Sequence, residues 1–288
     1  MKEDMLNNEG WSEVIAPRRH WFDLRLNELW RYRDLLFLFV KRDFTAQYRQ
    51  TILGPLWHII QPVFTTLMFL VLFTKIAKIP TDNLPHILFY MSSITIWNFF
   101  AGSLNSTAAT FTSNAGIFGK VYFPRLIMPL STVVSGMVRF GIQFCLLICF
   151  IAYYAITGIY EISFGWHILL FPFIVLIMAA MGLGLGIIIS SLTTKYRDLN
   201  ILISFGVSLL MYVTPVAYPI SFLQKSSFRE FIEWNPLSAL VEGFRYSLFG
   251  QGTFDIFFFT YSIIFTIIAL TAGVLIFNKV ERSFMDTV

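Results

Sequence analysis

Residues 167–192 read HILLFPFIVLIMAAMGLGLGIIISSL, a stretch without one formally charged side chain. A helix needs about 20 apolar residues to cross the hydrocarbon core of a bilayer, so this stretch predicts a membrane-spanning helix. The whole chain of 288 residues has the same bias, with 56% hydrophobic and only 13% charged residues. Soluble domains contain about 45–50% apolar and about 25% charged residues. We therefore expect an integral membrane protein and exclude a soluble enzyme and a disordered chain.

Five further stretches reach the length of a span, which predicts an all-α membrane protein with six transmembrane helices. The predicted spans are residues 53–74, 86–111, 126–156, 167–192, 199–217 and 256–278. They divide the chain into an N-terminal segment (1–52), a transmembrane domain (53–278) and a tail (279–288). Arg139 is the only charged residue inside the spans. It is either a functional group or a side chain that reaches the membrane boundary.

The distribution of Lys and Arg predicts the orientation of the spans. With the N-terminus inside, the inner segments carry 15 of the 21 Lys and Arg residues and the outer segments carry five. Because basic residues are retained on the cytoplasmic side, we expect both termini in the cytoplasm. The basic residues form no stripe with interleaved aromatic side chains, so we do not expect a nucleic-acid interface.

Two segments outside the spans are amphipathic or apolar. Between residues 26 and 44, apolar residues such as Leu29, Trp30 and Phe37 recur among charged ones. This pattern favours an interfacial helix in the plane of the lipid headgroups, and the alternative is a short cytoplasmic helix packed on another subunit. Residues 215–255 are too apolar for a solvated loop and too broken for two more spans. We expect short re-entrant or interfacial helices there, between spans five and six.

The sequence offers no catalytic constellation and no metal site. The four His residues are scattered, and none pairs with another at the spacing of metal ligands. Gly182, Gly184 and Gly186 lie inside a predicted span with no preceding strand, so they indicate close helix packing rather than a dinucleotide site. Apart from Arg139, the spans lack the ionisable residues that ion-coupled carriers keep near the midplane. The energy for any transport should therefore come from a cytoplasmic partner.

Several short motifs then resemble one family. Residues 48–57 read YRQTILGPLW and are followed by Gln61-Pro62, and residues 120–125 read KVYFPR. Tyr196-Arg197-Asp198, Asn235-Pro236-Leu237 with residues 242–245 (EGFR), and Glu281-Arg282 complete the series. Each motif is short, but they come in the expected order from about residue 21 to 288. Together they resemble the O-antigen and polysaccharide exporter permeases of the ABC type-2 transporters. Arg139 stands where that family leads us to expect an acidic residue beside Phe.

The resemblance implies the partners and the cargo. Two copies of the chain would form a homodimer in the bacterial inner membrane, with two separate ATP-binding cassette subunits below it. ATP and Mg would bind those subunits, and this chain would hold no cofactor and catalyse no reaction. The cargo would be a long glycan on an undecaprenyl pyrophosphate carrier. Residues 215–250 would form gate helices at the periplasmic mouth.

The resemblance and the apolar inner loops also imply site residues. The loops that would couple to the ATPase contain Ile117, Phe118, Lys120, Tyr122, Phe123, Arg125, Tyr196, Arg197 and Asp198. Sugar rings stack on aromatic planes, and the candidate lining residues of the path are Trp57, Phe64, Phe69, Trp97, Phe99, Phe100, Tyr212 and Tyr218. Basic residues that could meet the lipid pyrophosphate, or simply anionic headgroups, are Arg31, Arg33, Lys41 and Arg42.

Other functions remain open at the level of the sequence. A teichoic-acid or capsule exporter would share the same features. An ion-coupled carrier for small solutes would transport in a gradient without ATP. A glycan-modifying membrane enzyme would form product alone, although no catalytic constellation supports it.

Overall fold

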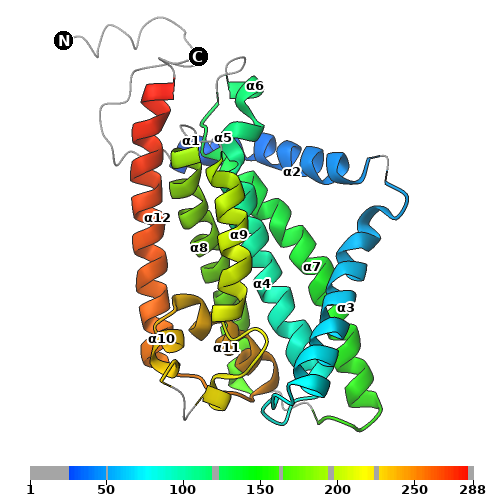
Figure 1. Ribbon diagram of the computed structural model, residues 1–288. Coiled ribbons are helices and arrows are strands. Elements are labelled where there is room, and N and C mark those ends of the chain that lie inside the picture. The colour runs from blue at the N-terminus through cyan, green and yellow to red at the C-terminus, as the bar shows by residue number, and fades with distance from the viewer. Residues whose placement is uncertain are drawn as a thin grey trace, which may run out of the picture.

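The computed structural model (Figure 1) describes residues 26–49, 51–118, 123–161, 165–193, 198–223 and 227–284. Over these residues the chain forms α-helices, short 3-10 turns and one π-helical segment, and it forms no strand. The all-α prediction is confirmed. Backbone N–H and C=O groups find no water inside a bilayer, and a helix satisfies them within one segment.

Five helical segments are long and apolar enough to cross a membrane. They are Gly54–Ile76, His86–Ala108, Ile127–Ile156, Trp166–Thr193 and Ile256–Lys279. The first contains α3 (Trp57–Phe69) and a π-helical segment (Leu70–Ile76). The others correspond to α4 (His86–Ala108), α7 (Ile127–Ile156), α8 (Leu170–Thr193) and α12, which continues to Phe284 (Ile256–Phe284). Five of the six predicted spans therefore form helices of sufficient length.

The remaining predicted span, residues 199–217, forms a shorter apolar helix. This helix, α9 (Leu199–Val213), has 15 residues and measures about 22 Å at about 1.5 Å per residue. It ends where Thr214 adopts an extended conformation ahead of Pro215. A residue before proline is driven away from helical geometry, which explains the early end. The helix runs beside α4 and α8 (Figure 1).

Helix α4 forms the centre of the bundle. It packs against α8, α7, α3 and α11 (Pro236–Phe249), and most of its residues are buried. Several of its buried side chains are hydroxyls. Ser92 Oγ donates to the Phe89 carbonyl at 3.0 Å and Thr95 Oγ1 donates to the Met91 carbonyl at 2.7 Å. These bonds within the helix let polar residues lie in a dry interior.

Glycines bring α8 close to two neighbouring helices. A Cβ built on Gly186 would lie 2.5 Å from Thr107 Cβ on α4, and one on Gly182 would lie 3.0 Å from Ser103 Cβ. On another side of α8, a Cβ on Gly184 would lie 2.7 Å from the Leu270 nitrogen of α12. The prediction that these glycines serve close helix packing is confirmed.

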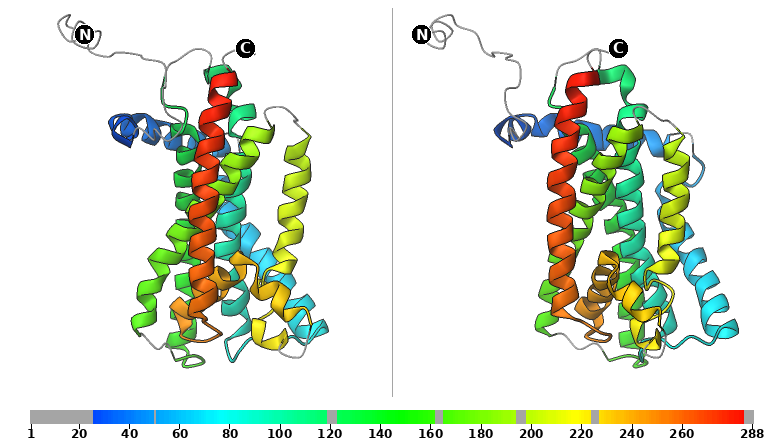
Figure 2. Two further views of the ribbon diagram at one scale, coloured as in Figure 1. Left: turned by 90° about the vertical axis from the view of Figure 1, so that its left-hand side faces the viewer. Right: turned by 60° about the vertical axis from the view of Figure 1, so that its left-hand side comes forward.

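The N-terminal helices lie across one end of the bundle. Helix α1 (Leu26–Arg31) is followed by α2 (Arg33–Tyr48), which runs roughly perpendicular to the long helices (Figures 1 and 2). Phe39 is buried, and its ring centroid lies 5.6 Å from that of Phe123. The described end of α12 lies at this same end of the molecule, as do α5 (Thr110–Ser113) and α6 (Ala115–Phe118). We call it the α2 end.

The segment between α9 and α12 forms short helices at the opposite end. These are a 3-10 turn (Ile220–Leu223), α10 (Arg229–Glu233) and α11. Asn235 caps α11 by accepting a hydrogen bond from the Leu237 N–H at 3.1 Å, and Gly250 ends it with φ of 65°. Helix α11 is largely buried among α4, α8 and α12. Helix α11 therefore packs inside the bundle, whereas Phe222, Phe228 and Phe231 before it are exposed.

Candidate functional site

A groove of about 760 Å³ lies between α3, α4 and α7. Its walls combine aromatic rings with uncharged amides and one cation, Arg139. The aromatic side chains that line it are Trp57, Phe64, Phe99 and Phe140. The amide side chains that line it are Gln47, Gln61, Asn98, Asn105 and Gln143. Such a lining offers both apolar surface and hydrogen-bond donors and acceptors to a ligand.

The groove continues toward the α2 end. A second hollow of about 470 Å³ shares Gln47, Asn105 and Arg139 with the first, and these three residues stand at the junction of the two. The second hollow is also lined by Arg42 and Asp43 of α2. The combined groove therefore runs along α4 and α7 and reaches the helix that lies across the bundle end.

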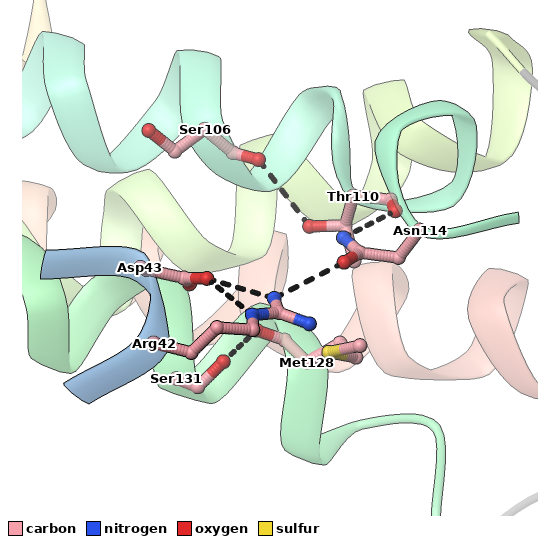
Figure 3. Close-up of polar contacts among 7 residues, drawn as sticks. All are labelled: Arg42, Asp43, Ser106, Thr110, Asn114, Met128 and Ser131. Carbon is pink, nitrogen blue, oxygen red and sulfur yellow. Dashed lines mark hydrogen bonds and ion pairs between the residues drawn. The ribbon is translucent and has the colours of Figure 1, made fainter. Parts of the chain in front are cut away.

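Polar contacts fix α2 over this second hollow (Figure 3). Arg42 donates to Asp43 Oδ1 through Nε at 2.9 Å and Nη2 at 2.7 Å, and Nη2 also reaches Asn114 Oδ1 at 3.2 Å. Asn114 in turn donates to the Thr110 carbonyl at 3.0 Å. The Arg42 guanidinium lies 4.8 Å from the Phe39 ring centroid. Both charges of the Arg42–Asp43 pair are thus engaged with each other and with the bundle.

The junction between α2 and α3 is also tied. Tyr48 at the end of α2 forms a hydrogen bond with His58 Nε2 on α3, and the two rings meet edge to face at 5.4 Å. His58 is buried and lines the groove. The tie holds the first turn of α3 against α2, and the later turns of α3 pack against α4 and α7.

Arg139 is half-buried and makes no hydrogen bond or ion pair with any of the described residues. Three polar atoms that line the same groove are buried without a hydrogen-bond partner. They are Asn105 Oδ1, Ser135 Oγ and Gln143 Oε1. Buried polar atoms are nearly always satisfied, so a cluster of unsatisfied ones beside a free cation indicates a place for a ligand.

The structure separates the aromatic residues predicted to line a path. Trp57, Phe64 and Phe99 line the groove. Phe69, Trp97 and Phe100 are buried in the core instead, where packing against neighbouring helices accounts for them.

The other two aromatic candidates lie at the far end of α9. Tyr212 is exposed there. Tyr218 is half-buried and donates to the Tyr212 carbonyl at 3.0 Å. Burial raises the pKa of Tyr218 to about 12, so its phenol stays neutral at physiological pH.

The predicted coupling residues lie at the α2 end as far as they are described. Ile117 is half-buried in α6, and Asp198 is exposed just before α9. Phe118 also belongs to α6. Phe123 and Arg125 are buried within the chain, Phe123 against Phe39. The positions that lie outside the described residues are Lys120, Tyr122, Tyr196 and Arg197.

Three of the four basic residues predicted to meet lipid headgroups are exposed. These are Arg31, Arg33 and Lys41. Arg33 lies 3.9 Å from Asp34 and 5.4 Å from the Trp30 ring centroid, but its side chain remains 53% exposed. The fourth, Arg42, donates hydrogen bonds to Asp43 and Asn114, so its guanidinium is less available to a lipid headgroup.

A buried ion pair that sequence reasoning did not anticipate lies in α11. Arg245 Nη2 lies 2.5 Å from Glu242 Oε1, and both side chains are almost fully buried. Arg245 also donates to Ser93 Oγ at 2.7 Å and to the Pro215 carbonyl at 2.8 Å. The Ile220 N–H donates to Glu242 at 2.9 Å. The pair therefore ties α11 to α4 and to the segment after α9. Residues 242–245 were noted only as a family motif, although opposite charges three residues apart are a signal for an ion pair on one helix.

The amides of the groove were also missed. Asn98 and Asn105 lie seven residues apart on α4, and Arg139 and Gln143 lie four apart on α7. Such spacings place each pair on one face of its helix. The signal was present in the sequence, but only the packing of α3, α4 and α7 shows that both faces meet the same groove.

The chain is similar to known transport proteins along most of its length. Residues 34–249 match the family described as ABC-2 type transporter. The chain is 28% identical over 253 residues to the O-antigen export system permease protein RfbA of Klebsiella pneumoniae, which covers 88% of this chain and 94% of the relative. It is 30% identical over 226 residues to RfbA of Myxococcus xanthus, with 76% and 82% covered.

A more distant similarity extends to another exporter. The polysialic acid transport protein KpsM of Escherichia coli is 20% identical over 262 residues, covering 88% of this chain and 95% of the relative. The family match spans about three quarters of the sequence, including α2, the groove and α11. The chain therefore belongs to the ABC-2 type transporter family.

Proposed function

We propose that this chain is the permease subunit of an ATP-driven exporter of a lipid-linked polysaccharide, in which the cargo is an O-antigen-like glycan on undecaprenyl pyrophosphate. The observation that carries the proposal is the groove of aromatic and amide side chains between α3, α4 and α7. The similarity to two O-antigen export permeases over most of their length supports the same cargo class.

The lining suits a sliding polymer of sugars. Amides such as Asn98 and Gln61 both donate and accept hydrogen bonds, and sugar hydroxyls do the same. Rings such as Trp57 and Phe64 offer flat apolar faces to the C–H faces of the sugars. Many weak contacts of this kind hold a chain without trapping it at one position.

The assembly that we propose contains two copies of this chain and two ATP-binding cassette subunits. One face of α3 exposes Phe64, Leu67 and Met68, which suits contact with lipid or with a second copy. The α2 end carries Arg31, Arg33, Lys41 and Arg49 and would face the cytoplasm by the positive-inside rule. The ATPase would then contact α6 and the inner loops. In this orientation α11 lies toward the periplasm, as re-entrant gate helices would.

Capsule export is the second candidate, favoured by the similarity to KpsM. An exporter of teichoic acid would use the same architecture. The glycan presented to the purified transporter distinguishes these cargoes.

The test reconstitutes the chain with its cognate ATPase in proteoliposomes and supplies lipid-linked glycan on the ATPase side. We expect ATP hydrolysis only when both subunits are present, stimulation by the glycan lipid, and ATP-dependent appearance of glycan in the lumen. Transport by the chain alone in an ion gradient would contradict the proposal and indicate an ion-coupled carrier. Conversion of a glycan substrate by the chain alone would identify an enzyme instead.

A further inference from the structure

Within the five long apolar segments the charged residues are Arg139 and, at or next to a segment end, Lys75 and Lys279. Arg139 is the thirteenth residue of α7, so it lies about 18 Å from the start of that helix at about 1.5 Å per residue. A charge at such a depth in a membrane is costly unless it faces a polar cavity or a partner of opposite charge. Arg139 faces the groove, where it lines both hollows.

The described residues supply no such partner. Asp43 lines the second hollow together with Arg139, but Arg42 donates two hydrogen bonds to its Oδ1. Arg139 therefore keeps its hydrogen-bond donors for another group.

Space for that group exists beside the guanidinium. Gly136 lies one turn before Arg139, and a Cβ built there would lie 3.8 Å from Arg139 Nη2 and 3.2 Å from Ser103 Oγ. The absence of a side chain at Gly136 keeps this part of the groove open.

The unsatisfied atoms around Arg139 differ in chemistry. Ser135 is 7% exposed, and its hydroxyl Oγ has no partner, so it can donate to an anion. Gln143 is 8% exposed, and its Oε1 has no partner, as is true of Asn105 Oδ1. Amide carbonyls accept hydrogen bonds from hydroxyls rather than from phosphate oxygens. One groove thus offers a cation and a hydroxyl beside two free carbonyl acceptors.

We propose that Arg139 and Ser135 bind the phosphate of a lipid headgroup, and that Gln143 and Asn105 accept hydrogen bonds from the sugar attached to it. A guanidinium matches phosphate oxygens in a bidentate geometry, which an ammonium does not reproduce. The ligand class is a glycosyl phosphate or pyrophosphate lipid. This site deepens the proposed function, on which its assignment to the transported lipid rests.

The phosphate could belong to the carrier lipid of the glycan or to an ordinary phospholipid. The experiment measures the binding of three probes to the permease–ATPase complex in nanodiscs. The probes are a polyprenyl pyrophosphate that carries one sugar, the same polyprenyl pyrophosphate without sugar, and phosphatidylglycerol.

We expect Arg139→Gln to weaken binding of both pyrophosphate lipids about 10-fold to 100-fold, because a charge-assisted pair is lost. Arg139→Lys should recover part of that loss, since the charge remains but the planar fork does not. Gln143→Leu should weaken only the probe that carries the sugar. Lys75→Gln removes an exposed cation at the opposite end and should bind all probes as the unsubstituted chain does.

The outcomes separate the site from the function. If Arg139→Gln weakens the binding of phosphatidylglycerol as much as that of the pyrophosphate lipids, the site binds phosphate but is filled by phospholipid, which overturns its assignment to the transported lipid. If the Arg139→Gln variant binds every phosphate lipid as tightly as the unsubstituted chain does, the proposal is overturned. If the site binds these lipids but the complex transports no glycan lipid, the site stands and the proposed function fails. If the Arg139→Gln variant still transports glycan with ATP and binds the lipids with unchanged affinity, the proposed function holds and the proposed site is rejected.

Discussion

Two arginines in apolar surroundings illustrate how different the settings of one residue type can be. Arg245 is fully buried and surrounded by Glu242, Ser93, the Pro215 carbonyl and the Phe89 ring, whose centroid lies 4.2 Å away. Arg139 faces a groove with its donors free. The first has the contacts of a structural cation and the second has the surroundings of a ligand-binding one.

This contrast yields a prediction about Arg245. Arg245→Met should destabilise the protein by about 3–5 kcal/mol, because it leaves the carboxylate of Glu242 buried without its counter-charge. Thermal unfolding in detergent, followed by tryptophan fluorescence, measures the change. Arg229→Met is the matched control: its pair with Glu233 is partly exposed, and such pairs contribute about 0–1 kcal/mol. Equal losses of stability in the two variants would contradict the structural role of the buried pair.

At the scale of elements, the contact between α8 and α12 depends on two glycines that face each other. A Cβ on Gly184 would meet the backbone of Leu270, and one on Gly273 would lie 2.7 Å from the Gly184 carbonyl oxygen. Backbone cannot move aside as a flexible side chain can. The two helices can therefore approach this closely only where both lack a side chain.

Gly184→Ala should accordingly destabilise the bundle by about 1–3 kcal/mol, the usual cost of overpacking, despite the higher helix propensity of alanine. Gly206→Ala on α9 is the control, since a Cβ there meets nothing within 4 Å. Melting temperatures of the two purified variants provide the comparison. If Gly184→Ala melts at or above the temperature of Gly206→Ala, the close packing does not limit stability.

Element boundaries depend on local chemistry that extends beyond hydropathy. The apolar run 199–217 continues past Thr214, but Pro215 ends α9 before the run does. Average hydropathy treats the proline as one more residue of the run. Proline, however, has no N–H to donate and clashes with the residue before it, which ends the helix. This is why a predicted span became a shorter helix.

At the scale of the whole molecule, the α2 end is the surface on which we propose that the ATPase docks. Helices α2 and α6 and the start of α9 all lie at this end of the molecule (Figures 1 and 2). Phe123 packs against Phe39, so the chain just before α7 is anchored to α2. The partner surface that we propose therefore centres on α6 and the residues just after it.

Phe118→Asp combined with Tyr122→Asp should abolish co-purification of the ATPase or uncouple its ATP hydrolysis from glycan transport, because a buried apolar contact would receive two carboxylates. Pull-down and ATPase assays on the co-expressed subunits test this. Ile159→Asp, at an exposed apolar position at the opposite end, serves as the control and should retain the complex. Retention of both assembly and coupling in the double variant would exclude the proposed role of this loop.

The sequence by itself determined that the protein is helical, that it is a membrane protein, where its long apolar helices lie, and that Gly182, Gly184 and Gly186 serve packing. These properties are local, since in a bilayer only a helix satisfies the backbone hydrogen bonds of an apolar segment within that same segment. Only the tertiary structure decided which side chains face the groove. Trp97 and Phe99 are both buried aromatic residues of α4, but only Phe99 also lines the groove. In a membrane protein the lipid-facing and core-facing surfaces are both apolar, so hydrophobic periodicity does not distinguish them. The surroundings of Arg139 and Arg245 depend on neighbouring helices far apart in the chain, and that proximity exists only in the folded molecule.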